Sequence, residues 1–208
     1  MRDRETGSWW QQVTGECISG PLQGTTLELV PNDELTFGLW KSEAPRGLVL
    51  EPVVGHEKDY DGNWEKEVAR LPVTVSFPRR GLGDRDVVIG VEIGGEARAF
   101  PLSRIQAETP MKDKMKGVPI LLVIGPDGKS VRVFRSMLNG SEVELYHDQQ
   151  ATQWQLVDGR GGTWSFQGCA VSGPMAGNCL EQLRYLKDYW FDWRNYHPLT
   201  TVAGERPL

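Results

Sequence analysis

The sequence predicts a β-rich α+β fold made of antiparallel hairpins or a meander, sandwich-like or barrel-like, with two or three short helices. Three observations support this class. Short alternating segments are separated at close intervals by turns rich in Gly and Asn. The regular strand–helix–strand alternation of a doubly wound parallel sheet is absent. One phrase of the chain occurs twice, which predicts an internal duplication.

The repeated phrase reads Ser-Gly-Pro-x-x-Gly-x-x-Leu-Glu. It begins at Ser19 and again at Ser172, 153 residues later. The same offset relates Trp40 to Trp193 further along the chain. Six shared positions in ten, extended without a gap, indicate two related segments rather than a chance match.

This repetition divides the chain into three predicted parts. Residues 1–54 form the closing half of a first repeat unit, and residues 68–208 form a fuller second unit. Residues 55–67 connect them, because the composition there turns polar and acidic, as is typical of a surface connection.

The first part has few predicted elements. The residue before a proline avoids the α region, so a helix that contains Leu35 and Trp40 should end at Ala44, before Pro45. Its N-cap is expected at Asn32 or Asp33. Three short strands are expected, at residues 9–12, 26–30 and 48–50.

The second part is richer in hairpin signals. Alternating apolar residues and the Gly94-Gly95 turn predict the clearest hairpin, and Asn139-Gly140 is another strong turn signal. The stretch 103–116 is short on apolar residues and is expected to be a short helix or a loop. The other predictions are an edge segment at 71–77, strand pairs at 87–93 with 96–100, 118–124 with 131–134 and 154–157 with 163–166, and a helix at 188–196.

Composition limits the partners that we expect. The 208 residues have a net charge of −5, and no Lys/Arg cluster exceeds Arg79-Arg80, which argues against nucleic-acid binding. No apolar run approaches the roughly 18 residues of a membrane span, so we expect a soluble globular chain without membrane insertion. The partner that we expect is a small ligand or a protein, and the composition does not exclude a homo-oligomer. The localisation is undetermined.

The three cysteines are too few for a disulfide framework. We expect Cys17, Cys169 and Cys179 to be small buried residues, since free cysteine behaves as a small hydrophobe. The alternative is a disulfide between Cys169 and Cys179, formed in an oxidising compartment.

Tests for known catalytic and cofactor motifs favour none. Gly125–Ser130 ends in Gly-Lys-Ser, but the first glycine of a phosphate loop is missing and a strand follows, which indicates a hairpin turn. The histidines, His56, His147 and His197, have no metal-ligand spacing. We therefore expect no cofactor, no metal and no assigned catalytic residue.

The aromatic segment Tyr189–Tyr196 has two interpretations. It could line a ligand groove, but the packing of an amphipathic helix into the core is favoured, with Trp190 and Trp193 on different sides. If a ligand is bound, we expect the charged residues of the clearest hairpin and of this helix to meet it: Glu96, Arg98, Asp192 and His197.

Several phrases together resemble a bacterial family of unknown function, DUF3179. They are Asp3–Ser8, Gly20–Gly24, Val88–Leu102 and Asp188–Pro198. The resemblance implies a unit that begins with a Gly-Glu-Ala-Arg hairpin and closes with the Gly-Pro-Leu phrase and a Trp/His-Pro helix. By this comparison the first unit is incomplete, because its opening hairpin is missing.

The chain departs from that family pattern where cysteines and a histidine are expected. Gly125–Gly128 replaces a Cys-Pro-Leu-Cys-Gly segment, and Ala107–Thr109 replaces Trp-His-Glu. Any redox or metal role of those side chains is therefore not carried over. The leading hypothesis is a non-catalytic binding or structural domain. The alternatives are an enzyme that uses a carboxylate with His147 or His197, and an assembly module completed by a partner chain.

Overall fold

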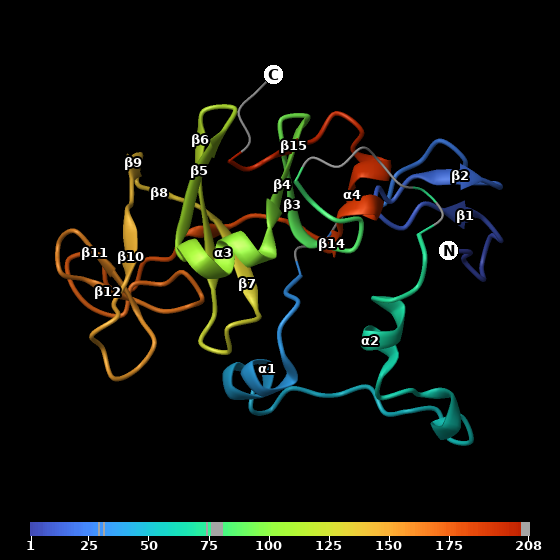
Figure 1. Ribbon diagram of the computed structural model, residues 1–208, viewed down its shortest axis with the longest axis horizontal. Coiled ribbons are helices and arrows are strands. Elements are labelled where there is room, and N and C mark those ends of the chain that lie inside the picture. The colour runs from blue at the N-terminus through green and yellow to red at the C-terminus, as the bar shows by residue number, and fades with distance from the viewer. Residues whose placement is uncertain (29, 31, 74, 76–80, 205–208) are drawn as a thin grey trace. The chain divides into compact units, whose positions relative to one another are not determined.

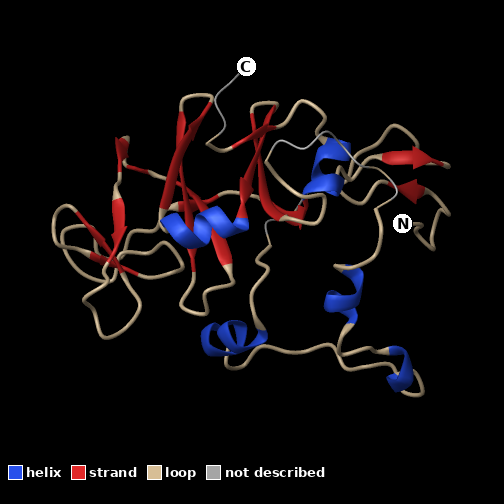
Figure 2. Cartoon of the chain, in the orientation of Figure 1, coloured by secondary structure: helices blue, strands red, loops and turns tan. Residues whose placement is uncertain are grey.

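The structure is a computed structural model that describes residues 1–28, 30, 32–73, 75 and 81–204 (Figures 1 and 2). The chain forms two compact units, Met1–Asn32 and Asp33–Leu208. This division by contacts differs from the repeat boundary predicted near residue 54, because residues 33–43 pack within the second unit.

The first unit contains the antiparallel pair β1 (Trp9–Trp10) and β2 (Cys17–Ser19). The strand expected at residues 9–12 is therefore present but shorter. The strand expected at 26–30 does not form in the described part, where Thr26 makes only an isolated bridge to Glu16. Leu29 in that range lies outside the described residues.

Helix α1 (Phe37–Glu43) opens the second unit. It ends at Ala44, before Pro45, as predicted. The predicted N-cap at Asn32 or Asp33 was wrong, because the Thr36 hydroxyl accepts the Leu39 N–H instead. Asp33 is held elsewhere, by the guanidinium of Arg132.

The connecting region has little regular structure. Residues 48–50 form no strand, contrary to the prediction, and no neighbouring strand pairs with them. A 3-10 helix (Glu57–Asp59) and helix α2 (Trp64–Val68) follow. Residues 74, 76 and 77 of the predicted edge segment lie outside the described residues, and its described residues form no strand.

Two four-stranded sheets form the body of the second unit. The first, named here the hairpin sheet, has the order β14-β3-β4-β15. The predicted hairpin around Gly94-Gly95 is confirmed as its antiparallel centre. Its strands are β3 (Val87–Ile93), β4 (Glu96–Pro101), β14 (Leu186–Tyr189) and β15 (Thr201–Val202).

The second, named here the central sheet, has the order β13-β7-β6-β5. Its strands are β5 (Met111–Met115), β6 (Val118–Ile124), β7 (Val131–Arg135) and β13 (Glu181–Gln182). The stretch 103–116 contains helix α3 (Leu102–Glu108) and β5. Sequence analysis missed β5 because only Met111 and Met115 of this strand are buried.

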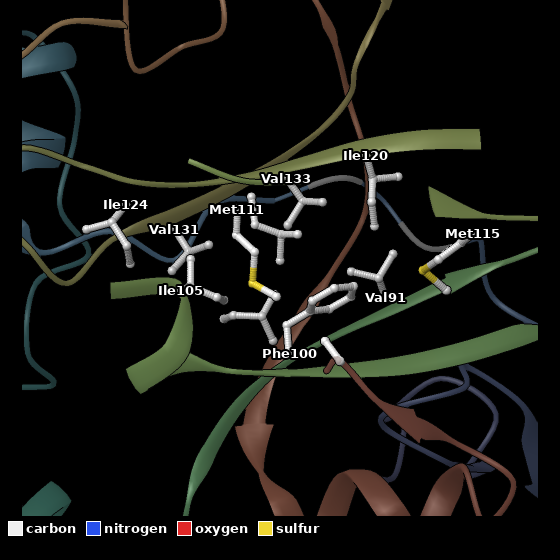
Figure 3. Close-up of a cluster of buried hydrophobic side chains, with 12 residues drawn as sticks. Val91, Phe100, Ile105, Met111, Met115, Ile120, Ile124, Val131 and Val133 are labelled. Atoms are coloured by element: carbon white, nitrogen blue, oxygen red, sulfur yellow. The ribbon is translucent and has the colours of Figure 1, made fainter. Parts of the chain in front are cut away.

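The two sheets share one core (Figure 3). Ile89, Val91 and Phe100 of the hairpin sheet pack with Ile120 and Val133 of the central sheet. Full burial of a side chain of this size contributes about 1.5–3 kcal/mol, so this layer is a major source of stability. It also sets the face of each strand that points inward.

The other face of the central sheet is also buried. Leu121 and Val123 pack there with Trp164 and Phe166, beside the small sheet of β10 (Leu145–His147), β11 (Leu156–Asp158) and β12 (Thr163–Trp164). The turn predicted at Asn139-Gly140 joins β8 (Met137–Leu138) to β9 (Ser141–Glu142). The strand pair predicted at 118–124 with 131–134 is confirmed, and the pair predicted at 154–157 with 163–166 forms over the shorter ranges 156–158 and 163–164.

Helix α4 (Trp190–Tyr196) covers the outer face of the hairpin sheet. Trp190 and Trp193 are both buried in the same cluster, so the prediction that they face different sides was wrong. Gly90 makes this possible, since a Cβ there would lie 2.2 Å from the Trp193 ring. The helix packs into the core, as the favoured interpretation expected.

The two copies of the repeated phrase have the same internal hydrogen bonds. Cys17 N–H donates to Thr25 O in the first copy, as Ala170 N–H donates to Asn178 O in the second. Leu27 N–H donates to Gly15 O, as Leu180 N–H donates to Gly168 O. Gly24 N–H donates to Cys17 O, as Gly177 N–H donates to Ala170 O. Each copy is thus a strand–turn–strand with the same backbone path. Duplication itself stays a prediction.

The fold class is the predicted one. The described strands pair antiparallel except β15 with β4, and four short α-helices accompany them. The sheets are open and form no closed barrel among the described residues. Among these residues there is also no helix with the length and apolar character needed to cross a bilayer.

Candidate functional site

A cavity of about 530 Å³ lies beside the second copy of the repeated phrase. Three turns border it, one side is open to solvent, and we name it the turn cavity. It is lined by Leu138, Asn139, Ser141, Glu142, Val143, Glu144, Asp158, Gly159, Arg160, Pro174, Met175 and Asn178. Its volume is within the range of small-molecule sites in proteins.

Asp158 holds one wall of the turn cavity in place. Its carboxylate accepts the backbone N–H groups of Arg160 at 2.8 Å and Gly162 at 2.9 Å, and the Trp164 indole N–H at 2.8 Å. Burial raises the pKa of Asp158, but these hydrogen bonds outweigh it and lower the pKa below its ordinary value. The carboxylate therefore stays charged and fixes the turn.

The Ser-Gly-Pro turn packs tightly on that wall. A Cβ at Gly173 would lie 2.5 Å from the Gly162 Cα, and Gly173 has a φ of +84°. Only glycine fits both conditions. The side-chain amide of Asn178 donates to the Met175 carbonyl at 2.9 Å and closes the same turn. The repeated phrase is thus a rigid structural element that also lines a cavity.

The β8–β9 hairpin supplies the opposite wall and most of the negative charge. Glu142 and Glu144 are exposed on either side of the buried Val143. Glu144 interacts with the Tyr146 hydroxyl and lies 3.5 Å from Lys112 Nζ, and these contacts lower its pKa. Among the described residues Glu142 makes no ion pair, and it lines the cavity.

Glu96 and Arg98 form an ion pair on the inward face of β4. The Arg98 guanidinium donates to Glu96 at 2.7 Å and to both Asp113 oxygens at 2.7 and 2.8 Å. Its Nε also lies 3.2 Å from the Thr201 hydroxyl. These contacts join β4 to β5 and β15 at the edge of the two sheets.

Asp192 and His197 belong to helix α4 and its C-cap. Burial raises the pKa of Asp192, and the nearby Arg85 opposes that shift. His197 lies against Trp193, with 3.9 Å between ring centroids, and its Nδ1 is 4.0 Å from Glu92. Burial lowers the pKa of His197, while Glu92 acts in the other direction.

The four residues are not brought into one site. Arg98 lies two residues before Phe100 on β4, so both side chains are on the face that meets the inter-sheet core. Helix α4 packs against Ala97 and Ala99 on the other face of the hairpin sheet. The pair Glu96 and Arg98 is therefore separated by the sheet from the residues of α4. A ligand role for the four residues stays a prediction.

In the described ranges, no three His, Cys, Asp or Glu side chains gather where a metal ion could be held. His147 lies on β10, with its ring 5.8 Å from that of Trp154, and His197 lies on the α4 side of the hairpin sheet. The two histidines proposed for an enzyme thus belong to different parts of the unit.

A disulfide joins Cys169 and Cys179 within the second copy of the phrase. The expectation of three buried thiols was therefore wrong for these two residues, and only Cys17 is buried and free among the described cysteines. The physical reason is strand pairing, because Cys169 and Cys179 face each other in an antiparallel bridge with 4.0 Å between their Cα atoms.

Sequence reasoning missed the turn cavity, although each turn that forms it was predicted. Turn signals at Asn139-Gly140, after Asp158 and at Ser172–Pro174 are visible in the sequence. These local signals do not predict that three turns from distant segments meet around one cavity. That arrangement depends on the packing around Trp164 and Val143.

Fold and site together define a β-rich protein of two packed sheets, with a polar cavity at a turn that the sequence repeats. The chain belongs to the family described as a protein of unknown function (DUF3179), whose model matches residues 1–200. Neither the curated proteins nor the solved structures include a match for it. The family description names no activity, and the turn cavity is therefore the feature that bears on function.

Proposed function

We propose that the protein is a non-catalytic binding domain whose small ligand occupies the turn cavity. The observation that supports this most strongly is the construction of the cavity walls. Asp158, Gly173 and Asn178 fix the backbone of two turns, while Glu142 and Arg160 extend charged groups beside them. Rigid walls with a few polar groups are typical of ligand sites, since less order is lost on binding.

The lining indicates the chemistry of the ligand. Glu142 offers a carboxylate, Asn139 and Ser141 offer hydrogen-bonding groups, and Met175 with Pro174 offers apolar surface. A compact organic cation with a short apolar part complements this combination, because a carboxylate prefers a charged donor. Amine- or guanidine-bearing molecules are therefore the proposed class.

The experiment is a thermal-shift titration of the whole chain with arginine amide and with putrescine, using succinate as the anionic comparison. We expect the cations to raise the midpoint of thermal unfolding in proportion to the logarithm of their concentration, and succinate to have no effect. Glu142→Gln should abolish the response. Glu65→Gln, on helix α2 outside the cavity, is the matched control and should retain it.

Two results would contradict this function. An equal response in Glu142→Gln would place the ligand elsewhere. Hydrolysis of a generic ester, glycoside or phosphate at a rate proportional to protein concentration would contradict the non-catalytic assignment.

The second candidate function is an enzyme, and one contact favours it. His197 Nδ1 lies 4.0 Å from the Glu92 carboxylate, and the His197 side chain retains 17% exposure. A partly buried histidine whose pKa is lowered can accept a proton as a general base, and here a carboxylate lies near its ring. If a generic substrate is hydrolysed, His197→Asn should remove the activity. His147→Asn should retain it, which distinguishes the two histidines.

We also propose that the chain arose by duplication and that residues 1–54 correspond to the second half of residues 68–208. The shared phrase and its matched hydrogen bonds support this. The two following helices add to it, since α1 and α4 start 153 residues apart and have the same length. Their C-caps, Ala44 and His197, have nearly identical angles, φ −124° and ψ 65° against φ −122° and ψ 68°.

A further inference from the structure

In the second unit, two elements near the C-terminus enclose the β3–β4 hairpin. Trp190 and Trp193 of helix α4 pack on the outer face of the hairpin, against Val88 and Ala99. Strand β15 then pairs parallel with β4, with Val202 opposite Ala99. Trp190, Trp193 and Val202 are 1%, 2% and 6% exposed. The hairpin is thus covered by a helix on one face and flanked by β14 and β15 at its two edges.

The counterparts of these elements, at the offset of the repeated phrase, are helix α1 and residues 47–50. Phe37 corresponds to Trp190, Trp40 to Trp193 and Val49 to Val202. Phe37 is 61% exposed and Val49 is 61% exposed, while Leu48 and Leu50 are 94% and 96% exposed. Helix α1 has the position of α4, but residues 48–49 form no strand and residues 33–36, the counterparts of β14, are bonded to Ser130 and Arg132. No hairpin formed by the described residues covers Phe37 or residues 48–50.

A neighbouring face of α1 is already occupied. Leu39 packs on the core behind the central sheet, and Glu43 is paired with the buried Arg132. Phe37 and Trp40, three residues apart, share a neighbouring face of α1, on which Phe37 is exposed and Trp40 is half-buried close to Gly47. Their rings contact each other, with 5.6 Å between centroids. The exposed face is therefore held in place.

We propose that Phe37, Trp40 and residues 47–50, named here the hairpin-docking face, bind a β-hairpin of a partner polypeptide. The occupant must have small residues where Gly90, Ala97 and Ala99 lie in this chain, because Trp193 packs flat on Gly90. Its outer strand must have a free edge, so that residues 48–49 pair with it in parallel as β15 does with β4. The inference rests on the proposed duplication and does not involve the turn cavity.

The chain itself supplies a probe with these features. A synthetic peptide of residues 86–102, cyclised end to end so that its strands stay paired, reproduces the hairpin that α4 and β15 enclose. We would titrate it, labelled, into the full chain by fluorescence anisotropy and follow hydrogen exchange of the backbone amides. Binding should slow exchange at residues 47–50 and leave residues 186–202 unchanged.

Matched variants test the face. Val49→Glu should weaken binding of the peptide roughly tenfold or more, since it places a charge at a buried contact. Val171→Glu changes another valine that is 68% exposed and should bind as the unaltered chain does. A peptide carrying Gly90→Leu should not bind, because the added side chain occupies the position of the indole ring. Glu142→Gln in the turn cavity should bind the peptide normally.

Three outcomes would overturn the proposal. The first is unchanged exchange at residues 47–50 at saturating peptide. The second is a change at residues 186–202 instead, which would mean that the peptide exchanges with the hairpin of the chain itself. The third is a dimer in sedimentation equilibrium whose residues 47–50 are protected without peptide, since a second copy would then be the occupant.

Discussion

The Arg132 guanidinium donates to the Glu43 carboxylate at 2.7 Å, although 89 residues separate them in the chain. Asp33 accepts from the same guanidinium at 2.6 Å, and the Phe166 ring lies 4.6 Å below it. The side chain of Arg132 is 5% exposed. This buried cluster fixes helix α1, and with it the hairpin-docking face, to strand β7.

Replacing Arg132 by Met should therefore destabilise the second unit. The change leaves Asp33 and Glu43 without their charged partner, and removing one partner of a buried ion pair costs about 3–5 kcal/mol. Urea denaturation monitored by circular dichroism measures the loss. Arg135→Met is the control, because Arg135 pairs with an exposed Glu181 and such pairs contribute about 0–1 kcal/mol. Equal losses in both variants would contradict the role given to the cluster.

Asp127 should make the docking of α1 sensitive to acid. Burial raises its pKa, but hydrogen bonds from Ser130 and Thr36 outweigh that and lower it to about 2 from 3.8. A carboxyl group whose pKa is lowered by folding stabilises the fold above its unfolded pKa, and the contribution is lost as pH falls from about 4 to 2. Asp127→Asn should flatten this dependence, which thermal unfolding at several pH values will show. An unaltered pH profile in the variant would refute the assignment.

Asp188 should have the opposite pH dependence. Burial, together with the nearby Asp192, raises its pKa to about 6, against a backbone hydrogen bond from Tyr189. Because folding raises the pKa of Asp188, its protonated carboxyl group stabilises the folded state. This contribution is fully present below about pH 4 and is lost as pH rises through about 6. Asp188→Asn should raise stability at pH 7 by about 1 kcal/mol, less than the shift alone implies because the group is half exposed. A loss of stability at pH 7 would contradict this.

The Cys169–Cys179 disulfide should stabilise the second copy of the phrase. It closes a short loop whose ends are separated by 10 in sequence, and loops of this size correspond to about 2–3 kcal/mol. Changing both cysteines to Ala should lower the unfolding free energy by that amount. A reducing agent should affect the unaltered chain similarly and leave the variant unchanged. The first copy, with Glu16 and Thr26 at the matching positions, keeps the same bridge without a disulfide.

Two glycines provide a matched pair of alanine substitutions. A Cβ at Gly90 would lie 2.2 Å from the Trp193 ring, so Gly90→Ala should cost about 1–3 kcal/mol or more. A Cβ at Gly38, inside helix α1, meets nothing within 4 Å. Gly38→Ala should therefore stabilise by about 0.5–1 kcal/mol. Midpoints of urea unfolding test both, and a shift in the same direction would contradict the packing described for α4.

Much of the fold could be predicted from local pattern. The hairpin around Gly94-Gly95 and the strand pair that begins at Val118 combine strict periodicity with turn glycines, and both were found. The strand β5 was missed, since Lys112 and Lys114 obscure its two buried methionines. Its position depends on its pairing with β6, a contact that no local pattern contains.

The candidate site was less predictable than the fold. The four charged residues lie in the most distinctive segments of the sequence, but Arg98 is already paired with Asp113 and α4 lies across the sheet. Side-chain partners of this kind come from strands far apart in the chain. The turn cavity was missed for the same reason, because its walls come from separate turns.

Residue types at short or constant spacing were enough to predict the β-rich class, the family and the likeness of the two Ser-Gly-Pro segments. Tertiary contacts were needed to show that Cys169 faces Cys179, that Trp190 and Trp193 share a side, and that residues 48–50 remain unpaired. Each of these depends on which surface lies opposite. Burial and strand pairing are properties of two surfaces in contact, and a local pattern describes only one of them.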